Sequence, residues 1–389
     1  MIIKNIRIYG IDEQFHEGNV CISGERFADS GAQGTGDQIL DGKGCYAIPG
    51  LLDIHFHGCL GLDVCDGTEE AVHTIARYEA ESGVTAICPA TLTLPADELK
   101  AILANMAEFR DRMERGEVVD GERCADIVGI NMEGPFISKV KKGAQNPDYI
   151  IPCDAELARE FYEASGGLLK FIGIAAEENP DFAGYIQKVK EFTGVSLAHT
   201  NADYETAKKA VDAGACHAVH LFNAMPEFTH RDPGVVGAVA DSPHVSAEII
   251  TDGVHIHPAM VRAAFRFNGP ERMIIISDSL RSTGMPDGEY VLGGQAITKK
   301  GKYCRLVEGG ALAGSVSNQF DCMVNAVKEM EIPLETAVAC STIHPAKALG
   351  VDDLYGSIEE GKYADLVLMN EDLALMAVVK RGKVIVNNL

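Results

Sequence analysis

The sequence predicts an α/β protein: a (β/α)8 TIM-like barrel with a small β-sandwich domain formed by both chain ends. From about residue 50 onward, short apolar runs alternate with longer amphipathic segments, the pattern of β/α units around a parallel sheet. Eight such runs can be counted, which is the number of strands in a closed barrel. The two chain ends instead carry short strand-like runs separated by turns. A doubly wound open sheet is the competing architecture.

The two ends of the chain differ from its middle. Residues 1–48 resemble short strands punctuated by glycine, and the opening run MIIKNIRIY alternates like a strand. The tail, residues 356–389, contains two strand-like runs, ADLVL at 364–368 and KVIV at 383–386. Because a domain closes on itself, two β-rich ends that flank a barrel most economically pair with each other. We therefore expect residues 1–48 and 356–389 to form the small domain, and residues 49–355 the barrel.

The expected barrel strands lie between helical stretches, of which 96–115 and 203–213 are examples. At 389 residues the chain exceeds the usual size of a single core, which also favours one domain of roughly 300 residues and a smaller companion. In chain order, the strands are expected at residues 51–57, 84–90, 127–132, 170–175, 195–199, 218–222, 246–251 and 273–277.

Composition argues against several classes of partner. A net charge of -23 and a pI near 4.9 oppose general affinity for nucleic acid or anionic lipid surfaces, because both need a positive field. An anionic substrate therefore needs a local basic pocket. Eleven cysteines without paired spacing, together with an N-terminus unlike a secretory leader, predict reduced thiols and a cytoplasmic protein. No run approaches the roughly 18 apolar residues that a membrane span requires.

The strongest functional signal is PGLLDIHFHG at residues 49–58, an apolar strand that ends in His55 and His57. Alternation places both imidazoles on one face of the strand. In a barrel that face is the interior, and the position is the C-terminal rim, where barrel enzymes place their chemistry. Two neutral imidazoles suit a divalent metal, although a pair of hydrogen-bonded core histidines explains this motif alone about equally well.

Later strands end in polar residues as well. Glu133 follows one apolar strand, His199 and His220 close two others, and Asp278 follows the run MIIIS at 273–277. A carboxylate at the end of so apolar a strand is costly unless it is paired or ligated. One such strand end can be accidental, but five of eight that end in His, Glu or Asp are hard to attribute to core packing.

These residues predict a hydrolytic mechanism. The expected ligands are Glu133, His199 and His220 for one metal and His55 and His57 for a second, with Glu133 bridging. A bound metal acidifies water, and Asp278 would take a proton from that water and return it to a leaving nitrogen. The chemistry that follows is hydrolysis of a C–N bond. Zn²⁺ and Fe²⁺ both accept His and carboxylate ligands, so either metal fits.

The pattern of His-x-His on the first strand, with Glu, His, His and Asp on later ones, resembles the amidohydrolase superfamily. Longer strings narrow the resemblance to the N-acetylglucosamine-6-phosphate deacetylases, and they extend in order over nearly the whole chain. They are NMEGPF (131–136), KKGAQNP (141–147), AHTNA (198–202), HLFNAMP (220–226), HRDPG (230–234), DGVH (252–255), SD (277–278), GMPDG (284–288) and LAGS (312–315).

The resemblance implies removal of acetate from N-acetylglucosamine 6-phosphate to give glucosamine 6-phosphate, in a homodimer whose barrel is joined to a small β-domain. By position, Asp278 matches the catalytic acid/base, and His255 matches a His that binds the substrate near the reacting carbonyl. The nearby His257 has no such match and is expected to be structural. The positions that match metal ligands of the family are Glu133, His199 and His220.

Substrate contacts carry over in the same way. Asn223, Ala224 and Arg231 match phosphate-binding positions, and an Arg fork with backbone and amide donors suits a dianion. In this family the Arg can reach across the dimer. The other substrate-binding matches are Ala144, Gln145, Asp252, Leu312, Ala313 and Gly314.

Two departures from the family pattern stand out. Gln145 replaces a His of many relatives, which bears on sugar recognition, and Arg281, shortly after the catalytic Asp, is expected to add a cation near the site. Some relatives lack one His of the first-strand pair and use a single metal, whereas this chain has both, so we expect two metals per subunit. Cys59 and Cys65 lie just past the pair and are expected to pack rather than ligate.

Three alternatives compete with this interpretation. A deacetylase for the galactosamine epimer fits as well, because Asn223 and Arg231 cannot distinguish the configuration of one hydroxyl. A cyclic-amide hydrolase fits less well, since such enzymes often bridge their metals with a carbamylated Lys, a role that Glu133 fills here. A scaffold that kept the barrel and lost the chemistry would normally have lost ligands, yet every expected ligand and Asp278 are present.

Overall fold

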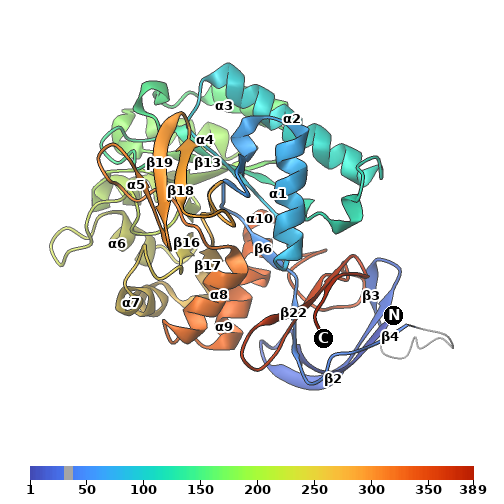
Figure 1. The fold of residues 1–389 in the computed structure, drawn as a ribbon. Helices are drawn as coiled ribbons and strands as arrows, with labels where there is room; N and C mark the ends of the chain where they lie inside the picture. Colours follow the sequence, from blue (N-terminus) through green and yellow to red (C-terminus); the bar gives the residue numbers. More distant parts are fainter. Residues whose placement is uncertain (30–37) are drawn as a thin grey trace.

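The protein is described by a computed structural model over residues 1–29 and 38–389 (Figure 1). Of the glycines in the N-terminal segment, Gly31, Gly34 and Gly36 lie outside the described residues. The middle of the chain forms a curled parallel sheet with helices around it, and the two chain ends lie together to one side of these helices.

The curled sheet consists of two hydrogen-bonded parts, one of three strands and one of seven; within each part the strands follow the order of the chain, and every neighbouring pair is parallel. This order contradicts a doubly wound sheet, in which the strand order reverses at a switch point. All eight predicted positions contain a strand, and the second and third are each split into two short strands. The bounds are β6 Leu51–Asp53, β9 Val84–Ile87, β10 Ala90–Thr91, β11 Asp126–Ile127, β12 Ile130–Phe136, β13 Leu169–Ile174, β14 Gly194–Leu197, β15 His217–Ala218, β16 Ser246–Ile250 and β17 Met273–Ile276.

The first and last strands of the curled sheet approach each other at their carboxyl ends. The backbone N–H of Asp278, after β17, donates to the carbonyl oxygen of His55, after β6, at 2.9 Å. The N–H of His57 donates to the carbonyl oxygen of Ser279 at 2.8 Å. The residues that follow β6 and those that follow β17 are therefore held at one rim.

Helices form where apolar residues recur at helical spacing and where a cap is available. In α5 (Tyr204–Ala213), the side chain of Asp203 accepts the N–H of Thr206 at 2.8 Å, and the helix ends at Gly214, whose φ of +127° suits glycine. The helices predicted at 96–115 and 203–213 are confirmed as α2 and α5. The α-helices besides α5 are α1 Glu69–Glu81, α2 Ala96–Glu114, α3 Ala155–Ala164, α4 Phe182–Val189, α6 Gly234–Ala240, α7 Pro258–Asn268, α8 Gln319–Lys328, α9 Leu334–Ser341 and α10 Ile343–Leu349.

Strands from the two chain ends pair with each other in one eight-stranded sheet with its own apolar core. β5 from the N-terminal segment runs antiparallel to β21 from the tail, with Leu366 opposite Pro49. The edge strand β3 also meets the tail, because the N–H of Phe27 donates to the carbonyl oxygen of Lys362 at 3.0 Å. The strands are β1 Ile2–Tyr9, β2 Phe15–Ser23, β3 Arg26–Ala28, β4 Ile39–Asp41, β5 Tyr46–Pro49, β21 Leu366–Met369, β22 Leu375–Lys380 and β23 Lys383–Asn387.

A buried ion cluster connects this sheet to the curled parallel sheet. Lys380 in β22 is only 1% exposed, and its Nζ lies 2.5 Å from Asp126 in β11 and 3.4 Å from Asp365. The hydroxyl of Tyr355 donates to the same oxygen of Asp126 at 3.0 Å. Because these charges are largely removed from water, each depends on its partners, and the cluster fixes one sheet against the other.

Two hairpin elements, neither of them predicted from the sequence, complete the described strands. The larger is a three-stranded antiparallel sheet of β18, β19 and β20, which Figure 1 shows projecting beside the curled sheet. Its first turn reaches the loop after β12, because the side-chain amide of Gln295 donates to the carbonyl oxygen of Ala144 at 2.5 Å. The bounds are β7 Gly58–Cys59, β8 Leu62–Asp63, β18 Gly288–Leu292, β19 Gln295–Lys300 and β20 Tyr303–Leu306.

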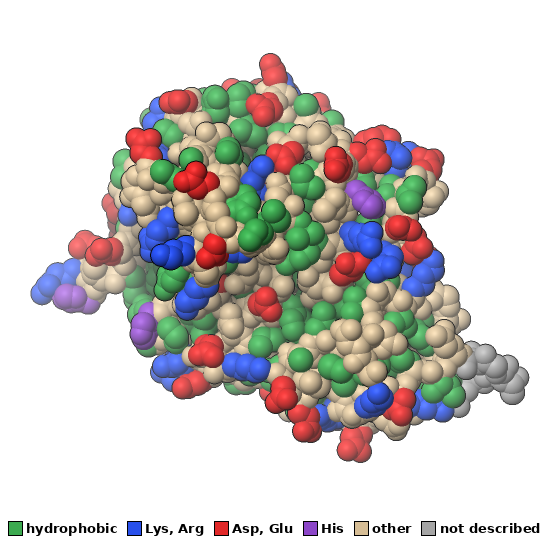
Figure 2. All heavy atoms as spheres, in the orientation of Figure 1, with side chains coloured by type: hydrophobic (Ala, Val, Ile, Leu, Met, Phe, Trp, Pro, Cys, Tyr) green, Lys and Arg blue, Asp and Glu red, His purple; other side chains and the backbone are tan. Residues whose placement is uncertain are grey.

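The surface has no continuous basic area on the face that Figure 2 shows, where acidic and basic side chains are interspersed. This distribution agrees with the net charge of -23. Within residues 1–29 and 38–389, no helix combines the length and the apolar character needed to cross a bilayer.

Candidate active site

Apart from Glu133, which lies within β12, the predicted metal ligands and Asp278 lie just beyond strand ends, because several strands are shorter than expected. β6 ends at residue 53 and β15 at residue 218, so His55, His57 and His220 follow their strands rather than closing them. The backbone leaves extended geometry at three of the candidates: φ is +43° at His199, +26° at His220 and +50° at Asp278. Non-glycine residues rarely adopt a left-handed backbone, and such strain concentrates at functional sites.

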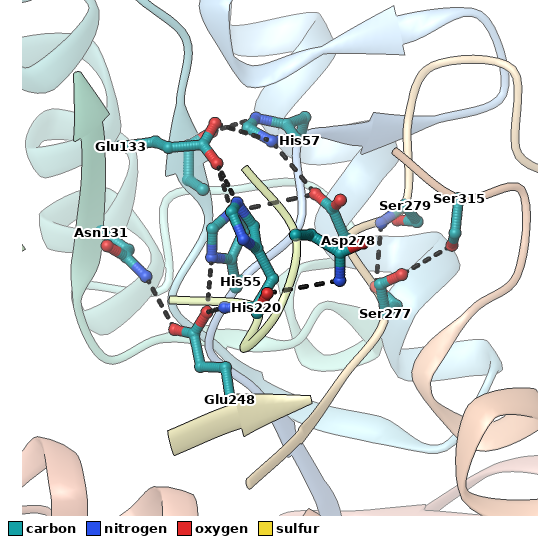
Figure 3. Close-up of polar contacts among 12 residues, drawn as sticks. His55, His57, Asn131, Glu133, His220, Glu248, Ser277, Asp278, Ser279 and Ser315 are labelled. Atoms are coloured by element: carbon teal, nitrogen blue, oxygen red, sulfur yellow. Dashed lines mark hydrogen bonds and ion pairs between the residues drawn. The ribbon is translucent and has the colours of Figure 1, made fainter. Parts of the chain in front are cut away.

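The carboxylate of Glu133, in β12, faces several imidazoles, among them His57, His55 and His220 (Figure 3). Its Oε1 is 2.9 Å from Nε2 of His199 and 2.8 Å from Nε2 of His220. From the end of β6, Nε2 of His55 lies 3.5 Å from Oε1, and Nε2 of His57 lies 3.6 Å from Oε2. Four imidazoles from distant parts of the chain therefore converge on one buried carboxylate.

Asp278 faces the same group from the end of β17. Its Oδ1 lies 3.3 Å from Nε2 of His57 and 3.8 Å from Nε2 of His55. The Asp278 side chain keeps 10% of its surface exposed, whereas the ring of His55 beneath it is fully buried. The carboxylate thus touches the imidazoles on one side and open space on the other.

In three of the four imidazoles, Nδ1 points away from Glu133 and lies within hydrogen-bond distance of an oxygen atom. Carbonyl and carboxylate oxygens accept hydrogen bonds, so each of these Nδ1 atoms carries a proton, and each Nε2 presents a lone pair to the centre. Metal-binding histidines are typically oriented in this way. The contacts are His57 Nδ1 to Ala90 O at 3.1 Å, His199 Nδ1 to Lys141 O at 2.9 Å, and His55 Nδ1 to Glu248 Oε2 at 2.8 Å.

The donor set fits a divalent cation. In the described part of the chain, Nε2 of His55 and Nδ1 of His220 are buried without a hydrogen-bond partner. Ligand atoms of His55, Glu133 and His220 lie within 4.8 Å of one another, and those of His55, His57 and Asp278 form a second such group. All ion pairs of the two carboxylates within the described ranges are with His, so no Lys or Arg neutralises them. Such a cluster suits a metal ion.

Both central carboxyl groups are ionised at neutral pH. Burial raises the pKa of Glu133, but the neighbouring imidazoles, first among them that of His199, hold it well below its usual value. Burial likewise raises the pKa of Asp278, and the neighbouring imidazoles, first among them that of His57, lower it overall. Ionised carboxylates can bind a cation or accept a proton.

A cavity opens over this group. Most residues predicted to bind substrate line it, and apolar side chains complete its wall. Its lining residues include neither Lys nor Arg, so the basic pocket expected for an anionic substrate is not supplied by the lining of this chain. The lining consists of His57, Leu92, Glu133, Gly143, Ala144, Gln145, His199, His220, Asn223, Ala224, His255, Asp278, Leu280, Leu292, Leu312 and Gly314.

Three predicted substrate contacts lie outside this lining. Arg231 is exposed on the loop between β15 and α6 and lines a separate hollow. Ala313 is fully buried behind the cavity wall. Asp252 lies behind His255, with Oδ2 2.8 Å from its Nδ1. Burial lowers the pKa of His255, but the hydrogen bond and charge of Asp252 raise it overall.

Of the two residues that depart from the family pattern, Gln145 reaches the site and Arg281 does not. The side chain of Gln145 contacts Glu133, since its Nε2 donates to Oε2 of that carboxylate. Arg281 does not line the cavity and instead pairs with Asp66 at 2.7 Å, so the prediction of an added cation at the site was wrong. His257 caps α7, with Nδ1 accepting the N–H of Ala259 at 3.2 Å, which agrees with a structural role.

The two cysteines near the His pair are free thiols. Cys59 is buried within the apolar core. Sγ of Cys65 accepts the N–H of Leu92 at 3.2 Å. Neither belongs to a described group of side chains that could hold a metal, in agreement with the expected packing role.

Sequence reasoning missed a second layer of polar residues beneath the site. Glu248 in β16 is fully buried, and hydrogen bonds link it to His55, His217 and Asn131 (Figure 3). A signal was present, because a carboxylate inside the apolar run SAEII at 246–250 is as costly to bury as Asp278.

Comparison with known proteins agrees with this geometry. The amidohydrolase family matches residues 46–386. The chain is 35% identical to the N-acetylglucosamine-6-phosphate deacetylase of Vibrio furnissii, over 87% of this chain and 82% of that one. It is 30% identical to an N-acetylgalactosamine-6-phosphate deacetylase of Escherichia coli O157:H7, over 86% of each chain.

Solved structures extend the similarity to the whole fold. A mutant N-acetyl-D-glucosamine-6-phosphate deacetylase from Mycobacterium smegmatis, solved in complex with N-acetyl-D-glucosamine-6-phosphate, matches with a TM-score of 0.89 and 28% identity. The match covers 100% of this chain and 99% of that chain. The curled parallel sheet, the cluster at its rim and these similarities together place the chain in the metal-dependent amidohydrolase family, among the N-acetylglucosamine-6-phosphate deacetylases.

Proposed function

We propose that this protein hydrolyses the acetamido group of N-acetyl-D-glucosamine 6-phosphate, releasing acetate and D-glucosamine 6-phosphate. The observation that carries the proposal is the convergence of four imidazoles on Glu133, with Asp278 beside them at the wall of a cavity. The identity of 35% to a deacetylase with this substrate in its name supports the choice of sugar.

The cluster would hold two divalent cations, Zn²⁺ or Fe²⁺. Glu133, His199 and His220 would hold one, and His55 and His57 the other, with Glu133 shared. When bound, such a cation acidifies a water molecule and polarises an amide carbonyl. The unpartnered Nε2 of His55, buried between two carboxylates, supports the second position.

Asp278 would move the proton of the reaction. Its ionised carboxylate takes a proton from the water that attacks the amide carbon, and delivers it to the nitrogen as the C–N bond breaks. His255, held by Asp252, would bind the substrate carbonyl and donate a hydrogen bond to it. The pKa of His255 is raised above its ordinary value, which supports the protonated form needed for this donation.

The substrate's phosphate would bind at Asn223 and Ala224, and its sugar at Ala144, Gln145 and the segment 312–314. No Lys or Arg among the described residues lines the cavity, which supports a homodimer in which Arg231 of a second copy completes the phosphate site. This exposed Arg lies on a loop outside its own chain's cavity, where another subunit can reach it.

The curled sheet would be a closed (β/α)8 barrel of residues 49–355, which the contacts between the ends of β6 and β17 support. Residues 1–48 and 356–389 would form a sandwich-like domain, because edge strand β3 meets the tail.

A cytoplasmic location is supported by eleven free thiols.

Acetate release from N-acetylglucosamine 6-phosphate tests the function directly. Wild-type protein is expected to release acetate, and Asp278→Asn to keep its metal while losing turnover by about a hundredfold or more. The galactosamine epimer, assayed beside it, separates the two sugar specificities. A wild-type protein with stoichiometric metal that releases no acetate from either sugar would exclude the proposed substrate class. Absence of both metal and turnover would favour the alternative that the protein is a non-catalytic scaffold.

A further inference from the structure

A buried carboxylate in the second layer connects both expected metal positions. Glu248 is fully buried and does not line the cavity, so it cannot touch a substrate there. Its Oε2 lies 2.8 Å from Nδ1 of His55 and accepts the backbone N–H of His220 at 3.1 Å. Its Oε1 lies 2.8 Å from Nε2 of His217 and 3.2 Å from Nδ2 of Asn131.

The neighbours of Glu248 are hydrogen-bond donors. Nδ2 of Asn131 also donates to the carbonyl oxygen of Ile54 at 3.1 Å, so the amide turns its nitrogen, and not its oxygen, toward Glu248. Nε2 of His217 faces an oxygen of the Glu248 carboxylate, which accepts hydrogen bonds, so this nitrogen carries a proton. Glu248 therefore accepts from Asn131, from His217 and from a backbone N–H, as an ionised carboxylate does.

This arrangement determines the tautomer of His55. Its Nδ1 faces an oxygen that already accepts a backbone N–H, so Nδ1 must donate and Nε2 carries the lone pair. That Nε2 is buried without a hydrogen-bond partner among the described residues. It is directed between Glu133 and Asp278, at 3.5 and 3.8 Å. The ring has no freedom to present its other nitrogen.

We propose that Glu248 is a positioning residue for the second cation. It holds the ring of His55 with Nε2 toward the centre of the site. Its negative charge also adds to that of the other carboxylates, so that two bound cations balance the charge of the site better than one does. The inference rests on the proposed function, because it assumes that the cluster binds metal. Within the described ranges, the ion pairs of Glu133, Asp278 and Glu248 are with His, so three buried negative charges face the site without Lys or Arg. One divalent cation leaves the summed charge of this group negative. Two cations make that charge positive, so an anionic oxygen ligand can also be bound.

The test is a Zn²⁺ titration of metal-depleted full-length protein, with wild type compared with Glu248→Gln. Wild type is expected to bind two equivalents. Glu248→Gln is expected to keep the tighter one and bind the other at least about tenfold more weakly, the usual effect of losing a partner behind a metal ligand. Glu79→Gln, which alters a fully buried carboxyl group in α1 outside both candidate metal groups, is the matched control and should bind two equivalents normally.

Two equivalents bound by folded Glu248→Gln with wild-type affinity would overturn the inference, and so would a wild type that binds a single equivalent. If Glu248→Gln does not fold, Glu248→Asp keeps the charge and shortens the reach to His55, so the second equivalent should again weaken. Undiminished affinity in that variant also contradicts the inference. A wild type that binds Zn²⁺ and releases acetate while both variants behave normally removes Glu248 from the account without touching the proposed function.

Discussion

The side-chain amide of Gln145 donates a hydrogen bond to Oε2 of Glu133, while Oε1 of the same carboxylate faces His199 and His220. Gln145 is itself held in place, because its Oε1 accepts the backbone N–H of Thr93 at 2.7 Å. Gln145 therefore lies in the cavity wall and also fixes the rotation of the shared carboxylate.

Replacing Gln145 with Leu should weaken metal binding as well as sugar binding. Loss of a hydrogen bond to a metal-binding carboxylate typically lowers metal affinity by about ten- to a hundredfold. A chelator competition assay with Zn²⁺ measures the effect. The control is Asn179→Leu, which alters a buried amide that bonds the backbone of Ala175 and Cys153. Unchanged metal affinity in Gln145→Leu would restrict this side chain to contact with the substrate.

Asp252→Asn should shift the pH dependence of the reaction. Burial lowers the pKa of His255 and Asp252 raises it, with a net rise, so the Asn variant loses the protonated imidazole at a lower pH than wild type. The alkaline limb of the kcat/KM profile is therefore expected to move to lower pH. If that limb stays in place, His255 does not act in its protonated form. Metal content should be the same in both proteins, because neither residue belongs to a metal group.

Glu79→Gln should stabilise the protein above neutral pH. Both carboxyl oxygens of Glu79 are buried without a partner in the described chain, and burial raises its pKa well above 4.5. The folded state retains a proton that the unfolded chain releases above about pH 4.5, so the free energy of unfolding falls as pH rises toward the folded pKa. Melting temperatures at pH 5 and pH 8 measure this. The advantage of the Gln variant should be larger at pH 8, and an equal difference at both values contradicts the assignment.

The sequence predicted which residues meet at this rim better than it predicted their surroundings. His55, Glu133, His199, His220 and Asp278 could be identified because each follows an apolar run, and parallel strands bring their carboxyl ends to one rim. The lengths of the strands were less predictable. At three of these residues a left-handed backbone conformation ends the extended geometry early. The spacing of apolar residues in the sequence does not predict where φ becomes positive.

Contacts between strands were also beyond prediction from the sequence. Glu248 meets His55 and Asn131 because β16, β6 and β12 enclose one interior, and neither their register nor their curvature can be deduced from apolar periodicity. Arg281 was expected near the site from its closeness to Asp278 in the chain. Its long side chain instead reaches Asp66, which offers an ion pair at a partly exposed position.

Removing the metal and returning it tests whether these histidines and carboxylates act by holding a cation. Protein depleted of metal by a chelator is expected to stay folded, lose nearly all acetate release from N-acetylglucosamine 6-phosphate, and recover it as Zn²⁺ or Fe²⁺ is returned up to two equivalents. Turnover at the untreated rate by protein shown to contain only traces of metal would contradict the claim that these histidines and carboxylates work by holding a cation.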